Sequence, residues 1–254
     1  GGGGSTGGAG GTAVYSPCPP LPAACKILPF GDSITDGVGA SGGGYRIELF
    51  RLALLDGKKI TFVGTAAPNG PTTVDGVAFP RQHEGHSGYT IDNQPAMGTI
   101  TARAGISPLV PTVMNATKPD IVTLMIGTND IQHSLVTNAP ERLARLIDSI
   151  IAADAHTLIV VAQIVPTTDA TVNMAIQNYN AAIPALVRAR AAAGKHVVLV
   201  DMYQVIAGDP GFRITGRTVP NPAIGPMNDW LHPNAAGYKL MGAAWYGALK
   251  SALR

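Results

Sequence analysis

A serine, a histidine and an aspartate in the sequence could together carry out acyl transfer. Ser33 could supply a hydroxyl nucleophile, and His232 could be the general base that takes its proton. Asp229 precedes His232 by three residues, so its carboxylate can bend back within one turn to accept the imidazole N–H. That contact would fix the tautomer of His232 and leave its other ring nitrogen free as a base. We therefore expect Ser33, Asp229 and His232 to be the catalytic residues.

Acyl transfer also needs hydrogen-bond donors for the negative charge that develops on the carbonyl oxygen. Asn129 has a neutral side-chain amide that can donate such a bond without adding a competing charge. Each of these residues also has an ordinary structural interpretation, because Ser and Asn are common in turns and Asn234 could simply cap a final helix. All of them are expected in loops at one edge of the fold, and this combination favours acyl transfer.

The elements that must position these side chains alternate between strands and helices. Strands are expected at 26–30, 59–65, 119–126, 157–164 and 196–201, and helices at 45–56, 141–155, 172–193 and 234–253. Pro184 is expected to kink the helix at 172–193. The strands are almost continuously apolar, which is typical of strands covered by helices on both faces. We therefore expect an α/β fold, a three-layer α/β/α sandwich on a central five-stranded parallel sheet.

In such a sheet, sites form where the strands deliver their carboxyl ends into loops. Ser33 directly follows the first expected strand, and Asn129 directly follows the third. The stretch from 66 to 109 has scattered Pro, Gly and Asn with weak periodicity, so it is expected to be rich in loops. Long loops in compact domains are usually functional or disordered.

The start of the chain differs in composition from the remainder. The first twelve residues contain eight glycines, and four prolines follow by position 22. We expect residues 1–24 to be a flexible Gly/Pro-rich linker and residues 25–254 to be a single domain. The linker is either artificial or the spacer that follows a removed signal peptide or a lipid anchor in an exported protein, and we favour a secreted protein. Cys18 and Cys25 could then close a disulfide, or they could be two free thiols.

The overall composition excludes several classes of protein. The chain has 254 residues, 46% of them hydrophobic and 13% charged, with a net charge of +2. These values exclude charge-driven disorder and give a weak electrostatic match to nucleic acid. Mean hydropathy is +0.18, but the longest apolar run, Leu158 to Ala162, is far shorter than the roughly 18 residues of a membrane span. We expect neither a nucleic-acid partner nor a membrane span, and the oligomeric state stays open.

Four segments in this order resemble the conserved blocks of the SGNH (GDSL-type) hydrolase superfamily. They are GDSITDG at 31–37, the glycine of GHSGY at 85–89, GTND at 127–130 and DWLHP at 229–233. The resemblance implies a flavodoxin-like sandwich with Ser33 as nucleophile, His232 as base and Asp229 as the group that orients it. It also implies an oxyanion hole formed by the backbone N–H groups of Ser33 and Gly88 and the side-chain amide of Asn129.

Two longer segments, HEGHSGYTID and DWLHPNAAGYKLMGAAWYGAL, are most similar to the acetylxylan esterases of carbohydrate esterase family 3. Those enzymes often carry Trp where this chain has Tyr89. The similarity implies removal of acetyl groups from an acetylated polysaccharide through an acyl-enzyme intermediate. The alternatives are a lipase, lysophospholipase or arylesterase of the same superfamily, acting on another small acyl ester, and a non-catalytic carbohydrate-binding module.

No cofactor and no metal are expected. Residues 37–42 fit G-x-G-x-x-G, but this motif starts seven residues beyond the expected first strand, and no acid follows the second strand to hold a ribose. His83 and His86 lack a third ligand at a metal-binding spacing, and histidines in loops are more often surface groups.

Overall fold

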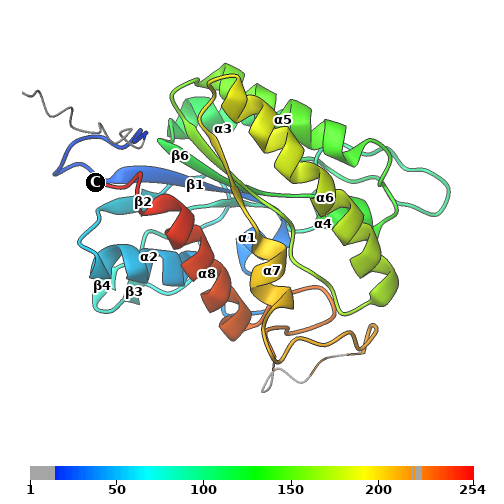
Figure 1. Ribbon diagram of the computed structural model, residues 1–254. Helices are drawn as coiled ribbons and strands as arrows, with labels where there is room; N and C mark the ends of the chain where they lie inside the picture. The colour runs from blue at the N-terminus through cyan, green and yellow to red at the C-terminus, as the bar shows by residue number, and fades with distance from the viewer. Residues whose placement is uncertain (1–14, 219, 221–224) are drawn as a thin grey trace, which may run out of the picture.

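A parallel sheet forms the centre of the structure (Figure 1). The computed structural model describes residues 15–218, 220 and 225–254. Five strands run in the spatial order β2-β1-β6-β7-β8. They are β1 (Cys25–Gly31), β2 (Ile60–Phe62), β6 (Ile121–Met125), β7 (Leu158–Ala162) and β8 (Val197–Val200). Every residue of β6 and β7 is buried. The predicted parallel sheet and α/β class are confirmed.

The sheet contains one short strand that was not predicted. β5 (Glu84–Gly85) pairs in parallel with the last two residues of β1, Phe30 and Gly31. It therefore adds a sixth strand to the sheet. β2 pairs with the beginning of β1, and β5 pairs with the end of β1 on the same side. Two residues are too few to show a period of two, so no sequence pattern could reveal this strand.

Helices cover both faces of the sheet (Figure 1). They are α1 (Ser33–Asp36), α2 (Arg46–Leu55), α3 (Val110–Thr117), α4 (Thr128–Gln132), α5 (Ala139–Ala153), α6 (Ala170–Ala192), α7 (Met202–Ala207) and α8 (Ala235–Leu249). Helices α3, α5 and α6 lie on one face, and α2, α7 and α8 lie on the other. The four predicted helices correspond to α2, α5, α6 and α8, whereas the remaining four are too short for their periodicity to be recognised.

Helix α6 contains Pro184 but continues for 23 residues through it. A proline inside a helix removes one N–H, so the carbonyl four residues earlier loses its partner. That carbonyl belongs to Asn180, and it accepts a hydrogen bond from Gln163 Nε2 at 3.1 Å. The Asn180 side chain also exchanges two hydrogen bonds with the backbone of Ile164. The loop after β7 thus supplies the partner that Pro184 removes.

The stretch from 66 to 109 is rich in loops, as predicted. It contains the antiparallel pair β3 (Thr73–Val74) and β4 (Val77–Ala78), the short β5 and a single 3₁₀ turn at 107–109. Arg46 of α2 is fully buried beneath this stretch and donates hydrogen bonds to the backbone carbonyls of Arg81 and Gln82. These bonds fix the stretch to the domain just before it reaches β5.

The described part of the predicted linker lies against the domain. Residues 1–14 lie outside the described residues, but Tyr15 stacks on His196, with ring centroids 3.3 Å apart. Ser16 Oγ donates a hydrogen bond of 2.6 Å to the carbonyl of Ala252. The structure thus differs from a flexible linker from Tyr15 onward, because an aromatic ring and a disulfide cysteine follow the glycines there.

Cys18 and Cys25 form a disulfide, which decides between the two alternatives that the sequence left open. Both residues are buried, and Cys25 is the first residue of β1. The bond joins the irregular segment before the sheet to the amino end of its first strand.

Among the described residues there is no helix both long and apolar enough to cross a bilayer.

Replacing both cysteines, Cys18→Ser with Cys25→Ser, should lower the free energy of unfolding by about 2 kcal/mol, because the short closed loop no longer restricts the unfolded chain. Urea unfolding of the double variant and its parent measures this difference. Any activity that depends on Ser33 should stay within about twofold, because Cys25 begins β1 and Ser33 lies just beyond its other end. Equal midpoints for the two proteins would contradict the stabilising role.

Candidate active site

The turn between β1 and α1 presents Ser33. Asp32 caps α1, and its Oδ1 accepts a hydrogen bond of 3.0 Å from the backbone N–H of Ile34. A Cβ on Gly31 would lie 2.2 Å from the carbonyl oxygen of Met125, so only glycine allows the turn to approach β6 this closely. As the first residue of α1, Ser33 also has a backbone N–H without an intrahelical partner.

A loop before α8 carries the histidine and the aspartate. Nε2 of His232 lies 3.0 Å from Oγ of Ser33, and its Nδ1 lies 2.9 Å from Oδ2 of Asp229. The loop is closed by a hydrogen bond of 2.8 Å from the N–H of Asn228 to the carbonyl of His232. Asn234 does cap α8, because its Oδ1 accepts from the N–H of Gly237 at 3.0 Å. Asn234 therefore caps α8, as its structural interpretation predicted, and His232 in the same loop still lies beside Ser33.

The Asp229 carboxylate is held in its charged form. Partial burial would raise its pKa, but hydrogen bonds from the His232 ring and from the N–H groups of His232 and Leu231 outweigh this effect. The pKa of Asp229 is therefore lowered to about 2. A carboxylate that is ionised at any working pH can orient the imidazole and stabilise its protonated form.

Asn129 lies in α4, directly behind β6, beside the segment that contains Gly88. Its Nδ2 donates a hydrogen bond of 2.8 Å to the carbonyl of Tyr89. A side-chain amide has two N–H groups, so the second remains available to another acceptor. Gly88 has a φ of +83°, and in the part of the chain that the structure describes its backbone N–H has no protein acceptor. The geometry thus brings two further donors to the same edge of the sheet.

The segment around Gly88 is fixed by contacts that the sequence did not reveal. The N–H of His86 donates to the carbonyl of Gly31 at 3.0 Å, and Arg103 Nη1 donates to the carbonyl of Gly88 at 3.3 Å. Ser87 Oγ donates to Asp36 at 2.9 Å. These partners are separated by 15 to 55 positions in the sequence, so no local pattern indicates them.

The two histidines of this segment are not ordinary surface groups. His83 is buried, and burial, together with the nearby charge of Arg46, lowers its pKa to about 4. His86 Nε2 lies 2.6 Å from Oε1 of the buried Glu84, and its ring stacks on Tyr89. Within the described residues, no group of three or more His, Cys, Asp or Glu could hold a metal ion.

Asp32, the residue before Ser33, was not singled out from the sequence. It is fully buried, and burial raises its pKa to about 6, although the N–H of Ile34 and the nearby Thr128 hydroxyl act in the opposite direction. Sequence patterns gave no sign of this, since an aspartate before a helix is ordinarily an exposed cap.

The pKa of Asp32 should make stability depend on pH. Because the folded pKa lies above the unfolded value, the folded state binds more protons between about pH 4 and pH 6, and stability falls as the pH rises through this range. Asp32→Asn keeps the capping oxygen but removes the titration. The parent should therefore lose up to about 3 kcal/mol relative to Asp32→Asn between pH 4 and pH 7. Urea unfolding at four pH values tests this, and a difference that stays constant with pH would contradict it.

The fold and this arrangement define a hydrolase of the SGNH type. Residues 27–245 match the sequence profile of the family GDSL-like Lipase/Acylhydrolase. The chain belongs to this family, and it is a carboxylic ester hydrolase. The resemblance found in the sequence segments is confirmed.

Similar proteins include two family 3 carbohydrate esterases. A family 3 carbohydrate esterase from Clostridium thermocellum is 32% identical, with a TM-score of 0.67 over 89% of this chain and 94% of that one. A family 3 carbohydrate esterase from Talaromyces cellulolyticus, 23% identical with a TM-score of 0.66 over 89% and 96% of the two chains, shares the fold. A multidomain esterase from Ruminococcus flavefaciens is 30% identical over 90% of this chain, which spans only 29% of that protein's length.

Proposed function

We propose that the protein is a serine esterase that removes acetyl groups from an acetylated polysaccharide of the acetylxylan type. The observation that carries this proposal is the continuous contact from Ser33 Oγ through the His232 ring to the Asp229 carboxylate. The family 3 carbohydrate esterase from Clostridium thermocellum, similar over nearly its whole length, supports the choice of substrate.

The reaction would proceed in two steps through an acyl-enzyme. Ser33 Oγ attacks the ester carbonyl carbon while His232 Nε2 takes the hydroxyl proton, and the imidazolium formed is stabilised by Asp229. The tetrahedral intermediate then collapses: the bond to the sugar oxygen breaks, and His232 returns the proton to that oxygen. In the second step a water attacks the carbonyl carbon of acetyl-Ser33 while His232 Nε2 takes a proton from it. The bond to Ser33 Oγ then breaks, His232 returns the proton to Oγ, and acetic acid leaves and ionises to acetate. Protons and electrons balance without a cofactor.

The oxyanion of each tetrahedral intermediate needs donors, and three lie at this edge of the sheet. We assign this role to the backbone N–H groups of Ser33 and Gly88 and to the free amide N–H of Asn129. All three are neutral, so they stabilise a charge that develops without binding tightly to an anion beforehand. The contact from Asn129 to the Tyr89 carbonyl holds the amide in one orientation.

We also propose that the protein works in an oxidising compartment, as a secreted enzyme would. The disulfide between Cys18 and Cys25 supports this, because such bonds persist outside the reducing cytosol. Alkylation of free thiols before mass spectrometry, on protein taken from the native culture medium, tests the idea. Unmodified, bonded cysteines in secreted protein are expected, whereas protein found only in cells with two alkylated thiols would contradict it.

Replacement of the nucleophile tests the main proposal. The parent should release acetate from acetylated xylan and from p-nitrophenyl acetate, and Ser33→Ala should lower both rates by at least 10³-fold, since only the oxyanion donors and binding remain. An unchanged circular dichroism spectrum of the variant is the control for folding.

The substrate is tested by the same assays. A sharp preference for acetyl over longer p-nitrophenyl esters, with acetate released from xylan, supports the carbohydrate esterase. A preference for long acyl chains without action on xylan would instead indicate the lipase, lysophospholipase or arylesterase alternative. Both outcomes leave the Ser33 mechanism in place.

Asn129→Ala should lower kcat for p-nitrophenyl acetate by about 10² to 10³, because one oxyanion donor contributes about 2.7–4 kcal/mol to the transition state. KM should change little, since this donor acts chiefly on the transition state. Asn178→Ala, on the exposed face of α6, is the matched control and should leave kcat unchanged. A rise in KM at constant kcat would contradict the assignment and make Asn129 a binding residue.

A further inference from the structure

A polar cavity of about 410 Å³ lies between the end of α4 and the start of α6. Its polar lining consists of Gln132, Ser134, Asp169, Thr171 and Arg217. Apolar side chains of α4, of α6 and of the loop that follows α4 complete it. This volume falls within the range of sites that bind small ligands, about 300–1,000 Å³. The acyl-transfer chemistry uses none of these five side chains, so the cavity needs another explanation.

Two residues that line the cavity are linked to the segments that carry the candidate active site. Gln132 ends α4, the five-residue helix that also carries Asn129. The Arg217 guanidinium, also in the lining, lies 4.4 Å from the ring centroid of Trp230. Trp230 stands between Asp229 and His232 in the chain. A ligand in the cavity would therefore lie next to the segments that also carry Asn129 and His232.

Arg217 is held in place, yet it keeps donors for a ligand. Its Nε donates to Asp169 Oδ2 at 2.8 Å, and the next residue back, Gly216, is bonded to Thr168 through both its N–H and its carbonyl. The N–H of Thr168 in turn donates to the carbonyl of Trp230 at 2.9 Å. Within the described residues no protein acceptor contacts the two Nη atoms of Arg217. A preorganised side chain with free N–H groups is typical of a binding site.

The charges of the cavity favour an uncharged ligand. Arg217 is paired with Asp169, so the two full charges cancel each other. The cavity therefore offers a ligand amide, hydroxyl and guanidinium groups together with apolar side chains. A sugar ring has the matching chemistry, because hydroxyl groups surround its edge and C–H groups cover its faces.

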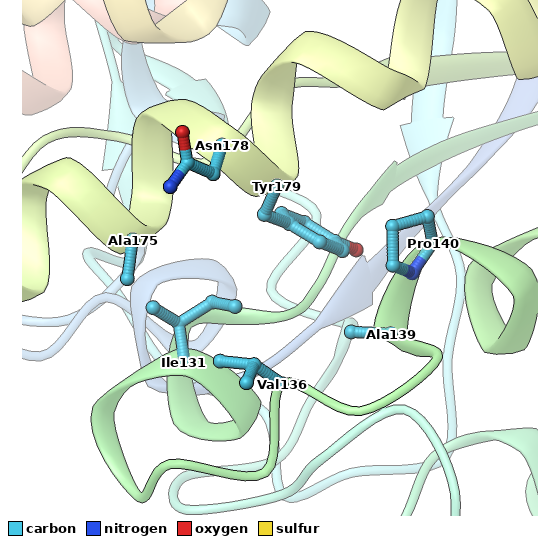
Figure 2. Close-up of a pocket in the computed structure, with 7 residues that line it drawn as sticks. All are labelled: Ile131, Val136, Ala139, Pro140, Ala175, Asn178 and Tyr179. Carbon is cyan, nitrogen blue, oxygen red and sulfur yellow. The ribbon is translucent and has the colours of Figure 1, made fainter.

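A neighbouring cavity of about 270 Å³ has a different character (Figure 2). It shares Ile131, Val136 and Ala175 with the polar cavity, and its other lining residues are Ala139, Pro140, Asn178 and Tyr179. The hydroxyl of Tyr179 already donates to the carbonyl of Ile126 at 3.0 Å, so Asn178 provides the one side-chain amide in this lining. This second cavity therefore offers few partners for sugar hydroxyls, and the polar cavity is the better match for a sugar.

We propose that the polar cavity is a subsite for the uncharged sugar chain that flanks the acetylated residue of the substrate. This proposal rests on the proposed function and deepens it. Gln132 and Arg217 are the specificity-determining residues, and they contact sugar units that do not react.

Kinetics with two substrates test the subsite. Gln132→Ala and Arg217→Ala should each lower kcat/KM for acetylated xylo-oligosaccharides at least tenfold more than kcat/KM for p-nitrophenyl acetate, which is too small to reach the cavity. Arg190→Ala is the matched control, because Arg190 pairs with Asp148 near the other end of α6. For Arg190→Ala, the ratio of kcat/KM for the oligosaccharides to kcat/KM for p-nitrophenyl acetate should equal that of the parent. Equal losses on both substrates in the Gln132 and Arg217 variants would overturn the subsite.

Direct binding gives a second readout that does not need turnover. Unacetylated xylohexaose should bind to Ser33→Ala protein, and the added change Arg217→Ala should weaken this binding at least fivefold by titration calorimetry. Oligogalacturonate of similar length should bind more weakly than xylohexaose, whereas stronger binding would contradict an uncharged ligand. If Gln132→Ala and Arg217→Ala release acetate from the oligosaccharide at the parent rate, the subsite is contradicted but the proposed function stands. Absence of any Ser33-dependent acetate release would instead remove the proposed function itself.

Discussion

The parallel register of β1 with β6, in which Gly31 lies opposite Met125, is the constraint on which the site depends. It makes two strands end side by side, so that the residues after them, Ser33 and Asn129, enter the same space. The pairing of β5 with the last residues of β1 adds a third strand end and brings the segment of Gly88 to it. Only the loop with Asp229 and His232 comes from outside this set, and its position is fixed by α8.

Two carboxylates near Ser33 have opposite electrostatic environments. Asp229 receives hydrogen bonds from the ring and N–H of His232 and from the N–H of Leu231, which lower its pKa to about 2. Asp32 is fully buried, with its pKa raised to about 6. Divergent environments of this kind allow chemically identical groups to serve different purposes. The Asp229 carboxylate beside His232 is therefore charged at neutral and mildly acidic pH, whereas the charge of Asp32, next to Ser33, changes within the mildly acidic range.

Much of this arrangement was predictable from sequence, and the remainder was not for physical reasons. The long strands and helices show clear hydrophobic periods, and the sequence blocks around Ser33, Asn129 and His232 indicated which strand ends matter. Short elements such as β5 and α4 have no measurable period. The contacts of Arg103 with Gly88 and of Arg217 with Trp230 join segments 15 and 13 positions apart through loops, where no local rule applies. The disulfide could not be predicted, since the spacing of Cys18 and Cys25 is equally compatible with two free thiols.

The contact between Ser16 and Ala252 brings the two ends of the described domain together at the amino edge of the sheet. Seven residues of β1, about 23 Å of extended chain, separate this edge from Ser33. Neighbouring domains joined to either end would therefore meet this domain on one side, with the reacting groups facing away from them. A polymer too large to diffuse into a pocket could approach the opposite side unobstructed. The two ends of the described chain and the candidate site thus lie on opposite sides of the sheet.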